Sequence, residues 1–371
     1  MKKFILWFLG SVALLLTLLI STVAGLLGTE SGTAWTLGKA REMAPDMLNF
    51  ESVQGHLLDR LVLGGVTLNL ASADIELGEL AFDWSPRRLL RRKLLVNEMT
   101  LTTLRVQSKP VPEEPEEPMT WPIELRAISP PVDVIITPVD IIDVEFSSAP
   151  DAAPLVLEAA GLGAYWNADD GVVLERLEVR GPGLELALEG RVNPLDNYLL
   201  EMHDRAAITL EDGTGFELAG TINGPVAGGD GQLELDQQLS GAAELGLTGT
   251  VLKPLVDPAW ELSLQLRALS NALLGEGLPL DLSGQLDSNG RFNPGTAEGM
   301  AEVSGQFVSA SEQVEFDALD ARLQLTADIG KQEVALQRLE LTQGGQPMRL
   351  TLAGDVSAEA VALEGDWDAL Q

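Results

Sequence analysis

Two histidines are the first residues to consider for acid–base or metal chemistry. His56 and His203 are the only histidines among the 371 residues, and the chain has no cysteine. A metal site or a nucleophile–base pair needs further donor side chains at a matching spacing, and neither histidine has one. The lack of cysteine excludes disulfides, thiolate metal sites and cysteine nucleophiles. We therefore expect no catalytic residue and no metal ligand.

Acidic and glycine-rich motifs add no further chemistry. Asp169-Asp170 and Asp212 each stand before a glycine, as in a tight turn, and they lack the alternating oxygen ligands and distal glutamate of an EF-hand loop. Gly161-x-Gly163 and Gly181-Pro182-Gly183 do not extend to GxGxxG before a helix, the pattern of a dinucleotide-binding turn. We predict a protein that is not an enzyme and takes no cofactor.

Charge is distributed unevenly along the chain. The formal net charge is −32, from 24 basic and 56 acidic side chains. Residues 1–109 hold 12 basic and 10 acidic side chains, whereas residues 110–371 hold 12 basic and 46 acidic ones. A surface as acidic as that of the second part repels nucleic acid and anionic headgroups. We expect no nucleic-acid partner.

An uncharged apolar run at residues 4–27 follows Lys2 and Lys3. Its length suits a membrane-spanning helix, which needs about 20 mostly apolar residues, and the two lysines favour a cytoplasmic N-terminus. The alternative is a cleaved signal peptide with Thr22-Val23-Ala24 as the cleavage triplet, although the run is longer than a usual signal-peptide core. Both interpretations export the remaining residues. The expected membrane-anchor residues are Phe4, Ile5, Leu6, Trp7, Phe8, Leu14, Leu15, Leu16, Leu18, Leu19 and Ile20.

Beyond residue 66 the dominant hydrophobic period is two, which is typical of strands with one buried face. Ile142, Val144 and Phe146, for example, alternate with Asp143 and Glu145. The apolar phase changes from odd to even numbers at Gly78, which suggests a bulge or a tight turn there. Glycine- and asparagine-rich turns separate the runs. Short strands joined by such turns predict a mainly β, antiparallel fold.

Two segments interrupt the strands. Residues 86–95, PRRLLRRKLL, have two possible interpretations: a basic patch that meets anionic lipid at the inner membrane, or a short amphipathic helix or loop that joins two strands. Residues 109–118, KPVPEEPEEP, are too rich in proline and like charge for a helix or a central strand and predict a linker or loop. We expect an anchor at 1–28, a membrane-proximal β region at 29–108, this linker, and a repeating β-groove at 119–371.

Several strands end in an apolar-x-apolar-x-Gly repeat, for example at Gly190, Gly249, Gly284 and Gly354. Irregular spacing makes this a strand-level repeat, typical of an array of like units. Such a sheet has one apolar face, and no second set of apolar elements is available to cover it. We expect an elongated, twisted sheet that curls around its apolar face to form a groove for apolar ligands. The expected groove-lining residues are Leu184, Leu186, Leu188, Trp260, Leu262, Leu264, Leu323 and Leu325.

The order of features over residues 1 to about 150 resembles the N-terminal part of TamB proteins, which belong with the AsmA-like proteins of Gram-negative envelopes. The export anchor, Ser52-Val53-Gln54-Gly55 and the Pro/Glu linker carry the resemblance. It also rests on Leu80-x-Phe82-x-Trp84-x-Pro86, followed by Leu89-Leu90, Leu94, Val96, Met99 and Leu101, and on the stretch from Pro122-Ile123-Glu124-Leu125 to Phe146.

The resemblance implies an inner-membrane protein, single-pass with a cytoplasmic N-terminus, whose bulk crosses the periplasm as a β-groove with an apolar interior. It implies a TamA-type outer-membrane barrel as partner, met through a C-terminal domain. Family members are longer, so we expect the chain to be incomplete at Gln371 and to lack that region. The family is linked to phospholipid transport between the membranes and to assembly of outer-membrane proteins and autotransporters.

Besides a purely structural periplasmic spacer, two functional hypotheses stay open at this point. In the first, phospholipid acyl chains lie along the apolar face and move by exchange between many weak sites. In the second, the protein is an assembly scaffold whose strand edges pair with incoming outer-membrane strands by β-augmentation, with no lipid-conduit role.

Overall fold

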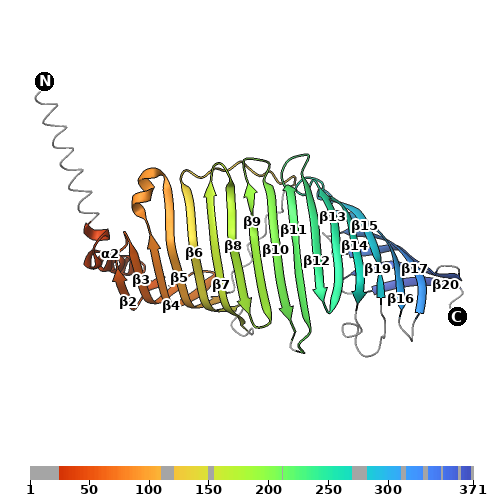
Figure 1. Ribbon diagram of the computed structural model, residues 1–371, viewed down its shortest axis with the longest axis horizontal. Helices are drawn as coiled ribbons and strands as arrows, with labels where there is room; N and C mark the ends of the chain where they lie inside the picture. The colour runs from red at the N-terminus through yellow and green to blue at the C-terminus, as the bar shows by residue number, and fades with distance from the viewer. Residues whose placement is uncertain are drawn as a thin grey trace, which may run out of the picture. The chain divides into compact units, whose positions relative to one another are not determined.

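The computed structural model describes residues 25–109, 121–148, 154–210, 212–269, 282–310, 315–328, 333–343, 346–357 and 361–368. Over these residues the protein is mainly β, with an open and largely antiparallel sheet, one α-helix of 14 residues and one 3-10 turn (Figure 1). None of the helices described here is long and apolar enough to cross a bilayer. The expected anchor residues, Phe4 to Ile20, lie outside the described ranges.

The chain divides into two compact units. Unit 1 comprises residues 1–116, 130–168 and 174–182, and unit 2 comprises residues 117–129, 169–173 and 183–371. Strand β8 (Gly171–Gly181) is divided between them, with residues 171–173 in unit 2 and the remainder in unit 1.

Unit 1 begins with the helix and continues as a sheet. Its elements are α2 (Glu30–Met43), β1 (Leu48–Asn49), β2 (Ser52–Gly55), β3 (Arg60–Asn69), β4 (Ala73–Trp84), η1 (Pro86–Arg91), β5 (Lys93–Ser108), β6 (Asp133–Ser147) and β7 (Leu155–Asn167). Strands β1 and β2 both pair with β3, and the ladder then runs through β4, β5, β6 and β7. One pair departs from the antiparallel prediction, because β5 and β6 are parallel. A parallel pair needs a long connection, and 24 residues, 109–132, separate β5 from β6; residues 110–120, most of the expected linker, lie outside the described ranges.

Helix α2 starts and ends at recognisable capping residues. The Thr29 side chain accepts a hydrogen bond from the Gly32 N–H, and the helix ends before Ala44, the residue that precedes Pro45. A residue before proline is disfavoured in helical conformation. Helix α2 therefore begins at the Thr29 cap and ends just before Pro45.

Unit 1 has a true core between α2 and its sheet. Phe50, Leu61, Leu63, Val66 and Leu77 are buried together, and Leu37 of α2 packs against them. Val66 is only 3% exposed. The Arg41 guanidinium lies 5.2 Å from the Phe50 ring centre, within cation–π range. The helix thus covers the apolar side of the first strands.

The phase change at Gly78 belongs to a row of kinks that crosses four strands. Gly65, Gly78, Thr103 and Asp143 lie level with one another in the ladders, and three of them have positive φ: Gly65 at 61°, Thr103 at 55° and Asp143 at 57°. Because every strand kinks at the same level, the pairing register is kept. The sequence pattern placed Ile142 and Val144 on the same buried side. In the structure Ile142, which pairs with Thr102, is 43% exposed, whereas Val144 is buried.

Unit 2 is an uninterrupted antiparallel ladder. Its strands are β9 (Leu184–Asn193), β10 (Leu199–Thr209), β11 (Gly215–Pro225), β12 (Gln232–Gly241), β13 (Ala243–Leu252), β14 (Ala259–Leu269), β15 (Leu282–Asn293), β16 (Glu298–Ala310), β17 (Glu315–Asp328), β18 (Glu333–Gln343), β19 (Gln346–Ser357) and β20 (Val361–Asp368). Each strand pairs with the next in sequence order, from β9 to β20. Residues 121–129 run along its strand ends, where the Ile123 N–H donates to the Leu255 carbonyl at 2.9 Å and the Tyr198 hydroxyl donates to the Arg126 carbonyl at 2.7 Å.

Candidate functional site, an apolar face of the sheet

The register of unit 2 gathers large apolar side chains onto one face. Directly paired residues of an antiparallel ladder point to the same side. Leu218 pairs with Leu239, which pairs with Leu245, which pairs with Leu266. A second row leads from Leu247 through Leu264 to Leu286. The eight residues expected from sequence to line a groove all lie on this face.

We call this surface the apolar face and follow it from β9 to β18. Its apolar members include Leu184, Leu186, Leu188, Leu200, Met202, Ala206, Phe216, Leu218, Ile222, Leu233, Leu235, Leu239, Leu245, Leu247, Val251, Trp260, Leu262, Leu264, Leu266, Leu286, Val303, Phe307, Leu319, Leu323, Leu325, Leu336, Leu339 and Leu341.

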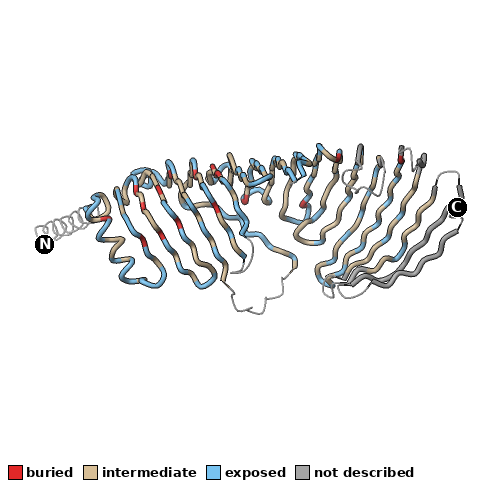
Figure 2. The backbone as a smooth tube through the Cα atoms, turned by 90° about the horizontal axis from the view of Figure 1, so that it is seen from below, coloured by how far each residue is buried: buried red, intermediate tan, exposed pale blue. Residues whose placement is uncertain are grey.

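The apolar face is half-buried rather than packed into a core. Its leucines are intermediate in exposure, while the alternate residues are mostly exposed, and Figure 2 shows the two classes alternating along the strands. Among the described residues of unit 2, Ala243 is the only buried hydrophobic one. All described elements of unit 2 are strands, so no described helix covers this face.

Glycines on the apolar face are covered by the large side chain directly opposite. A Cβ at Gly190 would stand 2.7 Å from Met202 Sδ, one at Gly249 would stand 2.9 Å from Leu262 Cδ2, and one at Gly284 would stand 2.7 Å from Phe307 Cδ1. Each of these glycines closes an apolar-x-apolar-x-Gly repeat. The repeat therefore has a structural role: the glycine leaves room for its neighbour's side chain to lie flat across the strand.

One polar bridge interrupts the apolar face. Asp204 on β10 and Gln237 on β12 flank Gly220 on β11 in a single row, and the Gln237 Nε2 donates to Asp204 Oδ1 at 2.7 Å across that glycine. Gln237 Oε1 is buried and has no hydrogen-bond partner. Sequence reasoning missed this bridge, although Asp204 stands in the apolar phase of Met202-x-Asp204-x-Ala206.

A second polar contact on the apolar face joins β14 to β15. Trp260 Nε1 donates to Ser288 Oγ at 3.1 Å, and the indole ring covers Gly290, where a Cβ would stand 2.6 Å from Cε2. The tryptophan thus has its nitrogen satisfied and its ring on the apolar face.

The opposite face of unit 2 is polar and charged. Arg191 binds Glu201 through two hydrogen bonds of 2.7 and 2.8 Å, and this contact lowers the pKa of Glu201. Hydrogen bonds from Gln285, and then from Ser263, lower the pKa of Asp287. Hydrogen bonds of this kind favour the ionised form of both carboxylates.

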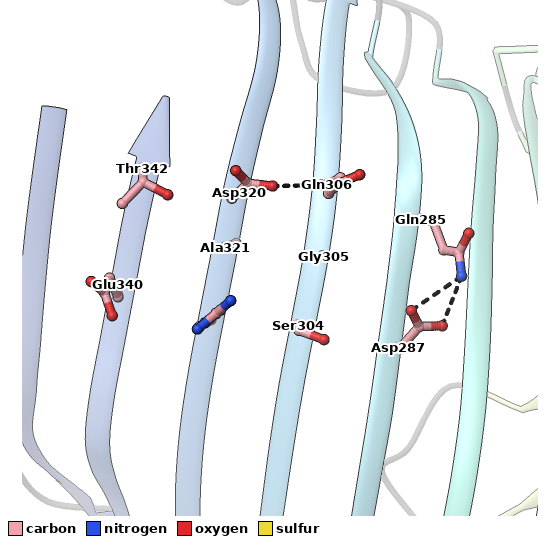
Figure 3. A pocket seen from close by; sticks show the side chains of 10 residues that line it. Gln285, Asp287, Ser304, Gly305, Gln306, Asp320, Ala321, Glu340 and Thr342 are labelled. Carbon is pink, nitrogen blue, oxygen red and sulfur yellow. Dashed lines mark hydrogen bonds between the residues drawn. The ribbon is translucent and has the colours of Figure 1, made fainter. Parts of the chain in front are cut away.

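A depression of about 670 Å³ on this side of β15–β18 is lined by polar side chains, and Figure 3 shows them standing on neighbouring strands. Gln306 donates to Asp320 at 2.8 Å and Gln285 to Asp287 at 2.9 Å. Within the described residues, no group of three or more His, Cys, Asp or Glu is placed to hold a metal ion. These contacts satisfy neighbouring side chains and supply no nucleophile–base pair.

Comparison with known families decides the relationship of the N-terminal part. Residues 19–170 match the family model described as TamB, N-terminal domain. This part of the chain belongs to the TamB family. The family recognised from the sequence is thereby confirmed, and TamB membership indicates a protein of the Gram-negative envelope. The match covers α2 and strands β1–β7, so it ends before the apolar face of unit 2 begins.

No curated protein and no solved structure was found to match this chain. The apolar face is therefore established by register and burial alone.

Proposed function

We propose that this TamB-family protein carries phospholipid acyl chains along the apolar face of unit 2, in the periplasm, between the inner and outer membranes. The observation that supports this proposal is an apolar surface that continues from strand to strand without a covering element among the described residues. Exposed apolar surfaces of such extent mark binding sites for apolar ligands or chains.

The dimensions of the apolar face fit an extended ligand. Neighbouring strands lie about 4.8 Å apart, so the ten strands from β9 to β18 cover on the order of 40 Å. Burial of a methylene group contributes up to about 0.8 kcal/mol, and a half-open face gives only part of that. Many weak contacts of this kind favour a ligand that is retained overall but exchanges locally.

Polar chemistry on the opposite face supports a non-enzymatic role. Glu201, Asp287 and Asp320 there are hydrogen-bonded to neighbours, and we infer that the carboxylates of this face keep an acidic, hydrated exterior around an apolar interior. The inner-membrane anchor at residues 4–27 and a TamA-type outer-membrane barrel as partner belong to the same proposal.

The scaffold hypothesis needs an accessible strand edge instead of an apolar face. In unit 1, helix α2 lies close to β1 and β2, and a helix that covers an edge strand restricts β-augmentation there. Lipid transport is therefore the preferred function, and strand assembly becomes the alternative outcome of the test.

The experiment is native mass spectrometry with lipid extraction on the full chain purified in mild detergent. Wild type should retain phospholipid, and Leu264→Asp should lose it because a charge on the apolar face repels acyl chains. Gln265→Asp is the matched control, since the neighbouring residue points to the polar face and is exposed; this variant should retain lipid.

Two results would contradict the proposal. Phospholipid absent from the wild type, or retained equally in Leu264→Asp and Gln265→Asp, would reject lipid carriage. Crosslinking to nascent outer-membrane strands, with proline placed on an edge strand as the perturbation, would then test the scaffold function.

A further inference from the structure

The most concentrated positive charge of this acidic protein lies at one turn of unit 1. Five of the chain's 24 basic side chains fall within residues 87–93. Lys93 pairs with Asp133 at 3.4 Å. Arg87, Arg88, Arg91 and Arg92 are exposed, and none of the carboxylates described forms an ion pair with them.

The same turn exposes two leucines. Leu90 is 89% exposed and Leu89 is 41% exposed, on the 3-10 turn η1 that joins β4 to β5 (Figure 1, orange). A leucine that exposed has no packing partner in the fold. Flanked by four arginines, it makes a small surface with an apolar tip and a cationic rim, the combination that binds at a lipid–water interface.

The turn is held firmly in this exposed position. The Ser85 N–H donates to the Leu95 carbonyl at 2.9 Å, and the Asn97 amide donates to Asp83 at 2.9 Å and to Ser85 Oγ at 3.0 Å. Arg92 is in left-handed conformation at φ 57°, and its N–H closes the turn onto the carbonyls of Arg88 and Leu89. The leucines are therefore presented by a rigid strand connection.

Hydrogen bonds connect this turn to the end of the sheet near residue 27, where the described part of unit 1 begins. The Leu58 N–H donates to the Leu27 carbonyl at 3.2 Å, and the Leu57 N–H donates to Thr33 Oγ1 at 3.1 Å. Trp84 Nε1, two residues before η1, donates to the Leu57 carbonyl at 2.6 Å. One short chain of contacts thus links the entry point of unit 1 to the basic turn.

We propose that η1 is a second membrane contact, with Leu89 and Leu90 inserted among the lipids and the four arginines bound to anionic headgroups. Charge complementarity commits the site to an anionic membrane surface, since the rest of the chain repels such a surface. Such a contact would fix the orientation of unit 1 on the membrane, because two points of attachment restrict rotation more than one does. The inference does not rest on acyl-chain carriage by unit 2.

The test uses the full chain reconstituted in vesicles and exploits the absence of native cysteine. Leu90→Cys carries an environment-sensitive fluorophore, with quenching by spin-labelled lipid and by aqueous iodide as the two readouts. The matched control is Phe146→Cys, which is exposed like Leu89 but lies toward the far end of the β5–β6 ladder, where it pairs with Val106.

We expect the label at residue 90 to be quenched by lipid and protected from iodide in vesicles of phosphatidylcholine and phosphatidylglycerol in equal parts, and the label at residue 146 to stay exposed. Protection should fall in phosphatidylcholine alone and at high salt, because surface attraction is screened within about 10 Å at 0.1 M salt and 3 Å at 1 M. Each Arg→Gln change among the four should weaken the contact roughly fivefold, whereas Arg→Lys should retain it.

Three outcomes would overturn the inference. If iodide quenched the labels at residues 90 and 146 equally in anionic vesicles, η1 would be shown to lie in water. Equal protection in phosphatidylcholine alone, unaffected by Arg→Gln, would remove the role of anionic lipid. Protection that grows with protein concentration would assign the surface to a second copy of the chain. The lipid retained in the mass-spectrometric experiment should be the same in the Arg→Gln variants, so the two proposals can fail independently.

Discussion

Units 1 and 2 use the same alternating strands but treat their apolar faces differently. In unit 1 the face is packed beneath α2 and includes Val66 at 3% exposure. In unit 2 the corresponding leucines stay half-buried, and Ala243 is the only buried hydrophobic residue among those described. The comparison shows that period-two patterning produces a sheet with an apolar side and leaves open whether that side becomes a core or a binding surface. Unit 1 has a helix of 14 residues that packs against its first strands, whereas all described elements of unit 2 are strands.

The largest expected effect is a charge placed in the unit 1 core. Val66→Asp should lower the free energy of unfolding of unit 1 by about 3–5 kcal/mol, because an unpaired carboxylate is costly at a buried site. Leu264→Asp in unit 2 should cost only about 1–2 kcal/mol, since its side chain can reach water. Limited proteolysis and thermal unfolding by circular dichroism measure both. Equal destabilisation would mean that the apolar face of unit 2 is also a packed core.

A bulky residue at a covered glycine should have the next largest effect. Gly249→Val should destabilise unit 2 by about 2–4 kcal/mol, because its φ of 155° is strained for other residues and a Cβ would meet Leu262. Gly246→Ala is the control on the same strand, where nothing lies within 4 Å of the new Cβ, and it should be neutral or slightly stabilising. Similar losses for both variants, measured by denaturant unfolding, would reject the role assigned to the repeat glycines.

The polar bridge on the apolar face should behave as a coupled pair. Asp204→Leu and Gln237→Leu should each cost about 1–2 kcal/mol, because each leaves a polar partner unsatisfied. The double variant should recover most of that loss and restore an unbroken apolar row. A double-mutant cycle in denaturant measures the coupling, and strictly additive losses would show that the bridge is not an interacting pair.

The smallest effect belongs to the exposed ion pair of the polar face. Glu201→Gln should change stability by only a few tenths of a kcal/mol, since both side chains are nearly half exposed and solvent screens the pair. The Arg191 hydrogen bond lowers the pKa of Glu201 below its ordinary value in the folded state. The small contribution is therefore present above the unfolded-state pKa and is lost as pH falls through the folded-state pKa. Unfolding of wild type and variant between pH 3 and 7 checks this, and a difference that grows as pH falls would have the wrong sign.

The sequence predicted the apolar face closely and the covered core poorly. Leu184, Leu264 and Leu323 share a face because strand residues alternate sides at every position, whatever the neighbour. Helix α2 could not be assigned to the core in this way, because Thr33 and Leu37 make contacts far along the chain. The Asp204–Gln237 bridge was also invisible, because it depends on which residue of β12 stands level with β10 across Gly220.

By itself the sequence determined the strand period, the charge of each part, the resemblance to TamB over the N-terminal residues and the basic segment at 86–95. Only the tertiary structure decided that β5 and β6 run parallel, that the positive-φ residues Gly65, Thr103 and Asp143 align, and that Leu90 stands in solvent. The physical reason is that local patterns fix which side of a strand is apolar, whereas strand partners, register and cover depend on contacts between residues far apart in the chain.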